Sequence, residues 1–117
     1  MRLVVAVHSR EMKTALFLAL SGVEVIEIVA TANTTAELVT FWRAFRPDVA
    51  IVESGLPGWA LDETINKLGE RTEDGRIFLI DGGEALDLAR ARPAVEVFKD
   101  IDSLIAALPR PTEEAAS

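Results

Sequence analysis

The sequence predicts an α/β fold in which a five-stranded parallel sheet is covered by helices on both faces. Short apolar segments rich in valine and isoleucine alternate along the chain with segments whose apolar residues recur at helical spacing. Such alternation is typical of right-handed crossovers between parallel strands. Residues 3–7 and 49–52 are apolar throughout, as expected of strands that are buried on both faces.

Five strands and five helices can be assigned in order. The strands are expected at residues 3–7, 25–32, 49–52, 76–80 and 95–98, and the helices at 10–20, 35–46, 61–68, 84–92 and 101–108. Ser9, Thr34 and Asp100 stand at N-cap positions, and Glu37 completes a capping-box pattern with Thr34. Pro47 ends the second helix.

The connections fit a flavodoxin-like (βα)5 three-layer sandwich with the sheet order 2-1-3-4-5. In this topology the functional crevice lies at the carboxyl ends of strands 1 and 3. The side chains expected there are polar: His8, Ser9, Glu53, Asp81 and Lys99. One domain is expected over residues 1–108. Residues 109–117 are rich in Pro, Glu and Ala, which predicts a disordered tail or the start of a linker.

Composition excludes several classes of function. The 117 residues carry a net charge of −7, which argues against direct binding of nucleic acid by this domain. The absence of Cys excludes disulfides and thiolate chemistry, and a single His excludes a multi-histidine metal site. No apolar run is long enough to span a membrane, and the chain opens on a strand-like segment rather than a signal peptide. We therefore expect a cytoplasmic protein.

Residues 46–58 read Arg46-Pro47-Asp48, four apolar residues, Glu53-Ser54-Gly55 and Leu56-Pro57-Gly58. This segment resembles the receiver domains of response regulators. Receivers read R-P-D, four apolar residues, the phosphorylated Asp, two residues and M/L-P-G. A Lys-Asp pair at Lys99-Asp100 is similar to the end of the fifth strand in receivers attached to helix-turn-helix effectors. The resemblance extends over residues 2–108.

The resemblance also implies that most of the phosphorylation chemistry is missing. Glu53 replaces the phospho-accepting Asp, and His8 and Ser9 replace the acidic pair that holds Mg²⁺. The switch Thr or Ser is replaced by Asp81, and the switch aromatic by Glu96. Only the lysine is retained, as Lys99. We therefore expect no metal, no cofactor and no enzymatic activity, because phosphoryl transfer depends on a metal that neutralises developing charge.

Individual residues leave alternatives. Glu53 is either a fixed mimic of the phosphorylated state or, as we favour, a structural ion-pair partner of Lys99. His8 is expected to be a hydrogen-bonded packing residue at a buried strand end. Asp81, followed by two glycines, forms either a tight turn with a helix cap or an anion-binding turn. Trp59, in the loop after strand 3, is either a partner anchor or a lid over the third helix.

These observations predict a receiver-like signalling domain that works without phosphorylation, through protein–protein contacts. The partner would be a separate protein, an attached DNA-binding or P-loop ATPase effector, or a second copy in a homodimer. The alternative is a flavodoxin-like regulatory domain that binds a small molecule or nucleotide in the same crevice, although the sequence has no glycine-rich phosphate loop after strand 1.

Overall fold

The computed structural model describes residues 1–23, 26–68, 76–80 and 95–108. In chain order the elements are β1 (Arg2–Ala6), α1 (Arg10–Leu20), β2 (Glu27–Ala32), α2 (Thr35–Phe45), β3 (Val49–Glu53), α3 (Leu61–Leu68), β4 (Arg76–Ile80), β5 (Val95–Phe98) and α5 (Ile101–Ala107). Within these residues every helix is too short or too polar to cross a membrane.

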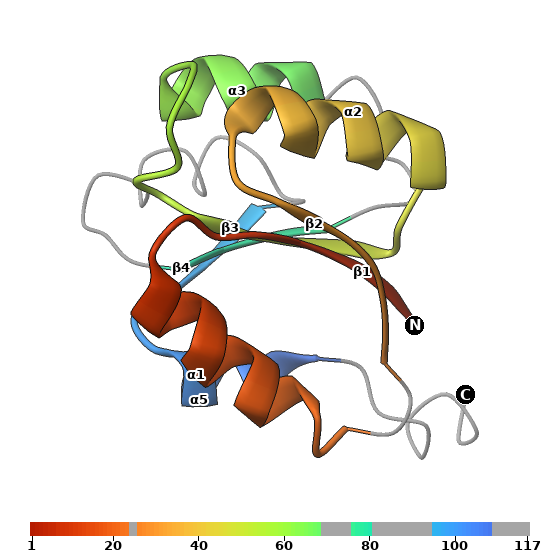
Figure 1. Cartoon of the computed structure of the whole chain (residues 1–117), viewed down its shortest axis with the longest axis vertical. Helices are drawn as coiled ribbons and strands as arrows, with labels where there is room; N and C mark the ends of the chain where they lie inside the picture. The colour runs from red at the N-terminus through yellow and green to blue at the C-terminus, as the bar shows by residue number, and fades with distance from the viewer. Residues whose placement is uncertain (24–25, 69–75, 81–94, 109–117) are drawn as a thin grey trace.

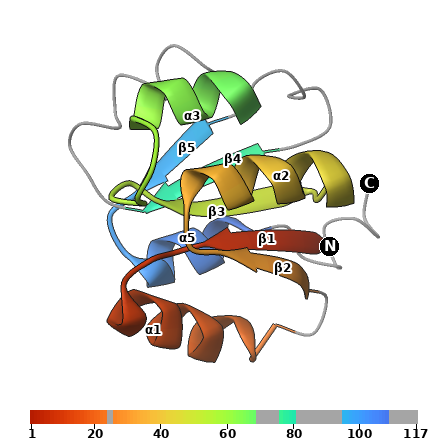
Figure 2. The same ribbon diagram turned by 45° about the horizontal axis from the view of Figure 1, so that its top comes forward.

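The strands form one parallel sheet in the order β2-β1-β3-β4-β5, which confirms the predicted topology. Helices α2 and α3 cover one face of the sheet, and α1 and α5 cover the other (Figure 1). The molecule therefore has the expected three layers. Turning the view by 45° separates the strands from one another, with α1 below the sheet and α5 partly behind it (Figure 2).

Each face of the sheet has its own apolar core. The core under α2 and α3 contains Trp42, which is fully buried and whose indole Nε1–H donates to the Leu68 carbonyl oxygen over 3.1 Å. The core under α1 and α5 contains Phe78, whose ring packs against that of Phe98 with 5.0 Å between centroids. The central strands β1 and β3 contribute to both cores, which is why they are continuously apolar.

The predicted N-caps of three helices are present. Ser9, Thr34 and Asp100 accept hydrogen bonds from the backbone amides three residues further on. The capping box of α2 is completed differently from the usual form, because Glu37 accepts from the backbone amide of Asn33 (3.2 Å). At its other end, α2 closes on Arg46, which has the left-handed φ of 46°.

Most predicted bounds are confirmed. The ranges of α3, β4 and β5 are as predicted, whereas β1 begins and ends one residue earlier than expected, at Arg2 and Ala6. Strand β2 begins at Glu27 rather than residue 25, and Leu108 is the C-cap of α5 rather than its last residue. The helix predicted at 84–92 and the tail at 109–117 lie outside the described residues.

We predict that Thr34→Ala lowers the free energy of unfolding by about 1 kcal/mol, because the Glu37 amide loses its capping oxygen at 3.2 Å. The measurement is equilibrium unfolding in urea. Thr40→Ala is the matched control, since Thr40 is exposed in the middle of the same helix and its hydroxyl only donates back to the Ala36 carbonyl. An equal loss for both variants would contradict the capping role.

Candidate functional site

The candidate site lies at the carboxyl ends of β1 and β3, which are neighbours in the sheet. Ala6 is paired with Val52, so the residues that follow each strand are brought side by side. His8 and Ser9 lead from β1 into α1, and Glu53 is the last residue of β3. The structure thus brings together three of the residues that the sequence placed in the crevice.

The Glu53 carboxylate binds the N-terminal end of α1. Its Oε2 accepts hydrogen bonds from the backbone amides of His8 (3.0 Å) and Ser9 (3.2 Å). Ser9 in turn caps the helix, its Oγ accepting from the Met12 amide over 3.3 Å. A carboxylate at this end is favoured both by the unpaired amides and by the positive end of the helix dipole.

Two expectations about this cluster were wrong. Glu53 and Lys99 both lie in the described part of the chain, and no salt bridge joins them there. The side chain of His8 is exposed rather than packed, and its contribution is the backbone amide. The physical reason for the first is that the two amides before α1 offer the glutamate an already oriented pair of donors.

Glu96, which the resemblance matches with the switch aromatic, takes part in an ion pair away from Glu53. Glu96, in β5, forms an ion pair with Arg76 at the start of β4. The Arg76 guanidinium also lies 5.6 Å from the centre of the Phe78 ring. This pair links the two strands across the α5 face of the sheet. Asp81, the residue at the other switch position, lies outside the described residues.

Lys99, which the resemblance matches with the receiver lysine, directly precedes a helix cap. Lys99 is exposed, and Asp100 follows it as the N-cap of α5. The Ser103 backbone amide donates to the Asp100 carboxylate over 2.8 Å and holds the pKa of Asp100 below its usual value. The Ser103 side chain and the charge of Lys99 act in the same direction.

The residues present do not fit the Mg²⁺ that receivers hold. Magnesium requires octahedral oxygen ligation, normally with one or two carboxylates. At the two acidic-pair positions this chain offers an exposed imidazole and a hydroxyl that caps α1, and Oε2 of Glu53 is bound to amides. Among the described residues, no three His, Asp or Glu side chains are grouped so that they could hold a metal ion.

The loop between β3 and α3 is fixed to the start of α2. The Thr35 amide donates to the Pro57 carbonyl (2.9 Å), and the Trp59 amide donates to Thr35 Oγ1 (2.8 Å). Gly58 has a φ of +124° and passes so close to Thr35 that a Cβ there would lie 2.1 Å from its Oγ1. Sequence reasoning identified the loop but missed Thr35, which carried no signal beyond its place after the N-cap.

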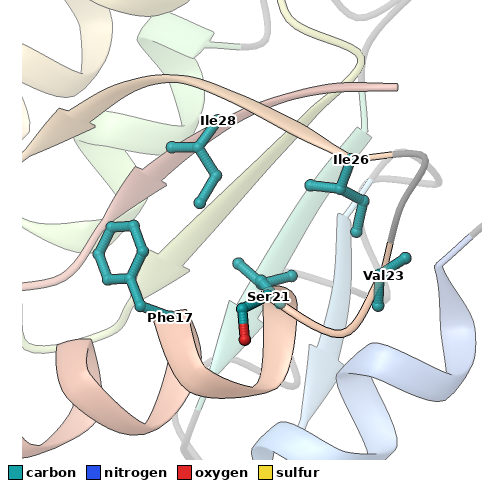
Figure 3. A pocket seen from close by; sticks show the side chains of 6 residues that line it. Phe17, Ser21, Val23, Ile26 and Ile28 are labelled. Carbon is teal, nitrogen blue, oxygen red and sulfur yellow. The ribbon is translucent and has the colours of Figure 1, made fainter.

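A cavity of about 400 Å³ lies elsewhere in the molecule, between the C-terminal half of α1 and the edge strand β2 (Figure 3). It is lined by Phe17, Leu20, Ser21, Val23, Ile26 and Ile28. Ser21 is the polar residue among these six, and its hydroxyl donates to the Leu18 carbonyl over 2.7 Å. None of the residues predicted to form the crevice lines this cavity.

Comparison with known proteins gives a consistent answer at the level of fold. No protein-family model matches the sequence, and no curated protein matches it. Solved receiver structures match it, one of them with a TM-score of 0.77.

Three of them illustrate the likeness. The signal receiver domain of the putative response regulator NarL from Mycobacterium tuberculosis has a TM-score of 0.75 at 19% identity, covering 98% of this chain and 94% of that chain. A LuxR-family DNA-binding response regulator from Staphylococcus aureus has a TM-score of 0.73 at 14% identity, covering 90% of this chain and 92% of that chain. The isolated RcsB receiver domain from Salmonella enterica serovar Typhimurium was solved with the phosphomimetic BeF3⁻ present. It has a TM-score of 0.75 at 15% identity, covering 92% of this chain and 86% of that chain. The chain therefore has the flavodoxin-like fold of response-regulator receiver domains.

Proposed function

We propose that this chain is a receiver-like signalling domain that acts through protein–protein contacts and does not use phosphorylation. The observation that carries the proposal is the binding of Glu53 Oε2 by the His8 and Ser9 amides. A carboxylate that is hydrogen-bonded to backbone amides at a helix N-terminus has a structural role, and we propose that it does not serve as a nucleophile. The chain keeps the receiver scaffold and uses its central acid to fix the β1–α1 connection.

The neighbouring positions support the same proposal. A receiver that responds to phosphorylation needs a metal-binding acid pair, and here those positions offer Ser9 as a helix cap and His8 as an exposed side chain. It also needs a switch residue that is free to move. Glu96 is instead engaged with Arg76, and its carboxylate would have to leave an ion pair to change position.

The output is proposed to be a protein partner or an attached effector. The LuxR-family structure from Staphylococcus aureus is described as a DNA-binding response regulator, which favours a DNA-binding effector over a P-loop ATPase. This domain itself is not proposed to bind nucleic acid, because its net charge is −7. Residues 1–108 form the proposed unit, followed by a linker or tail, in a cytoplasmic protein without enzymatic activity.

The proposal is tested by treating the whole chain with acetyl phosphate and, separately, with beryllofluoride, each with Mg²⁺. We expect no phosphoryl adduct in the intact mass and no change in the amide spectrum around Glu53. The RcsB receiver domain, whose structure was solved with BeF3⁻ present, is the positive control. A stable acyl phosphate, or saturable beryllofluoride shifts at residues 8, 9 and 53, would refute the proposal.

A further inference from the structure

We propose that Trp59, together with Asp62 and Glu63, forms a docking surface for an arginine-bearing segment of a protein partner. We call these three residues the Trp59 surface. The inference rests on the proposed function, because it names the chemistry of the partner that the domain would contact. It concerns the loop that follows Glu53 and the first turn of α3.

The indole of Trp59 is held at the surface by a fixed backbone. Trp59 is 37% exposed, whereas Trp42 is fully buried. The Trp59 amide is bound to Thr35 Oγ1, and Leu56, at the base of the same loop, is buried in the core. An aromatic ring on a loop tied in this way loses little conformational entropy when a partner contacts it.

The ring already accepts a cation. The ammonium of Lys67, on α3, lies 4.7 Å from the centre of the indole. Glu63 is four residues before Lys67, a spacing at which the two side chains would ordinarily pair along a helix. Both residues lie in the described part of the chain, and no salt bridge joins them there. Lys67 therefore contacts the Trp59 ring and not the Glu63 carboxylate.

Two exposed carboxylates, Asp62 and Glu63, follow Trp59 at positions three and four further along the chain. Asp62 and Glu63 occupy the first turn of α3, and within the described residues neither takes part in a salt bridge. Asp62 Oδ1 accepts from the Glu63 amide over 2.9 Å, which leaves its charge unneutralised. The two carboxylates of the Trp59 surface and the neighbouring ammonium of Lys67 together carry a net charge of −1.

An indole that is partly exposed at the surface, with two exposed carboxylates within four residues of it in the chain, matches the chemistry of arginine. A planar guanidinium stacks on an indole and donates to carboxylates in a forked geometry, whereas a lysine ammonium does neither as well. A second copy of this chain is disfavoured as the occupant, since it would bring two more carboxylates and its own net charge of −7 to the same surface. A polyanion is disfavoured for the same reason.

The test is a nuclear magnetic resonance titration of the whole chain with the peptide acetyl-Leu-Arg-Gly-Arg-Leu-amide at fixed ionic strength. We expect saturable shifts of the Trp59 indole proton and the amides of residues 58–63, with no shift of the buried Trp42 indole. Peptides with both arginines replaced by lysine or by citrulline should bind more weakly. Equal binding of the citrulline peptide, or no saturable shift with millimolar arginine peptide, would overturn the proposal.

Variants move the affinity in opposite directions. Asp62→Asn with Glu63→Gln should weaken binding of the arginine peptide about fivefold, because two exposed charge contacts are lost. Lys67→Gln should strengthen it, because the resident cation leaves the ring. Asp102→Asn, in the first turn of α5, is the matched control and should leave the affinity unchanged. Equal weakening by the control would show non-specific attraction and contradict a defined surface.

This experiment separates the inference from the proposed function. If acetyl phosphate modifies the chain, phosphorylation independence fails, whatever the peptide does. If the peptide does not bind at the Trp59 surface and the chain also resists phosphorylation, the docking surface fails alone.

Discussion

Replacing Gly58 by Ala is expected to lower the free energy of unfolding by about 3 kcal/mol, the largest effect we predict. Two independent costs add at this position. A φ of +124° is strained for any residue with a Cβ, and the new Cβ would lie 2.1 Å from Thr35 Oγ1 and 3.2 Å from Thr35 Cβ. Thr35 is buried at the start of α2, so it cannot move aside without disturbing that helix.

The measurement is equilibrium unfolding in urea, compared with Gly55→Ala. Gly55 lies in the same loop, and a Cβ there would meet no atom within 4 Å, so this control should change the stability little. Adding Thr35→Ala to Gly58→Ala should restore part of the loss, since it removes the atom that the new Cβ meets. Similar stabilities for the Gly58 and Gly55 variants would show that the loop is not tied to α2 as described.

The fold could be predicted from the sequence because its signals are local. Strand β4 begins and ends as predicted because a run of large apolar residues, 77–80, stands between polar neighbours. The N-caps could be predicted for the same reason, since Ser9 and Thr34 accept hydrogen bonds from amides only three residues away. Such features depend on residue type and short spacing, and both are visible in the sequence.

The partners inside the site could not be predicted in the same way. Sequence reasoning matched the Glu53 carboxylate with a charged side chain, Lys99, because charges are visible in a sequence and unpaired backbone amides are not. The amides of His8 and Ser9 become available only when β1 and β3 are side by side and α1 begins at the edge of the sheet. The contact of Thr35 with the β3–α3 loop was missed for the same reason.

Trp59 both contacts α3 and stays partly exposed. The sequence left two interpretations, a partner anchor or a lid over the third helix. In the structure the ring contacts Lys67 of α3 while the residue keeps 37% of its surface exposed. The contact with Lys67 fits the interpretation as a lid over α3, whereas a role as partner anchor stays a prediction, which the exposed part of the residue supports.

Glu53→Ala is expected to lower the free energy of unfolding by about 2 kcal/mol, because two hydrogen bonds to a charged acceptor and a favourable helix-dipole contact are lost together. The residue is half-buried, which keeps the loss below that of a fully buried charged contact. Glu53→Gln keeps an acceptor oxygen without the charge and should lie between the wild type and Ala. Glu11→Ala, an exposed carboxylate in the first turn of α1, is the control and should cost about 0.5 kcal/mol.

Glu53→Asp makes this prediction specific to the geometry. It introduces the residue found in receivers, yet the side chain is one methylene shorter, so its carboxylate should not reach the His8 and Ser9 amides together. We therefore expect it to resemble Glu53→Ala in urea unfolding, with both amide resonances shifted. If Glu53→Asp were as stable as the wild type, the reach of the longer side chain to both amides would not matter, and the contact of Glu53 with α1 would be incidental to the fold.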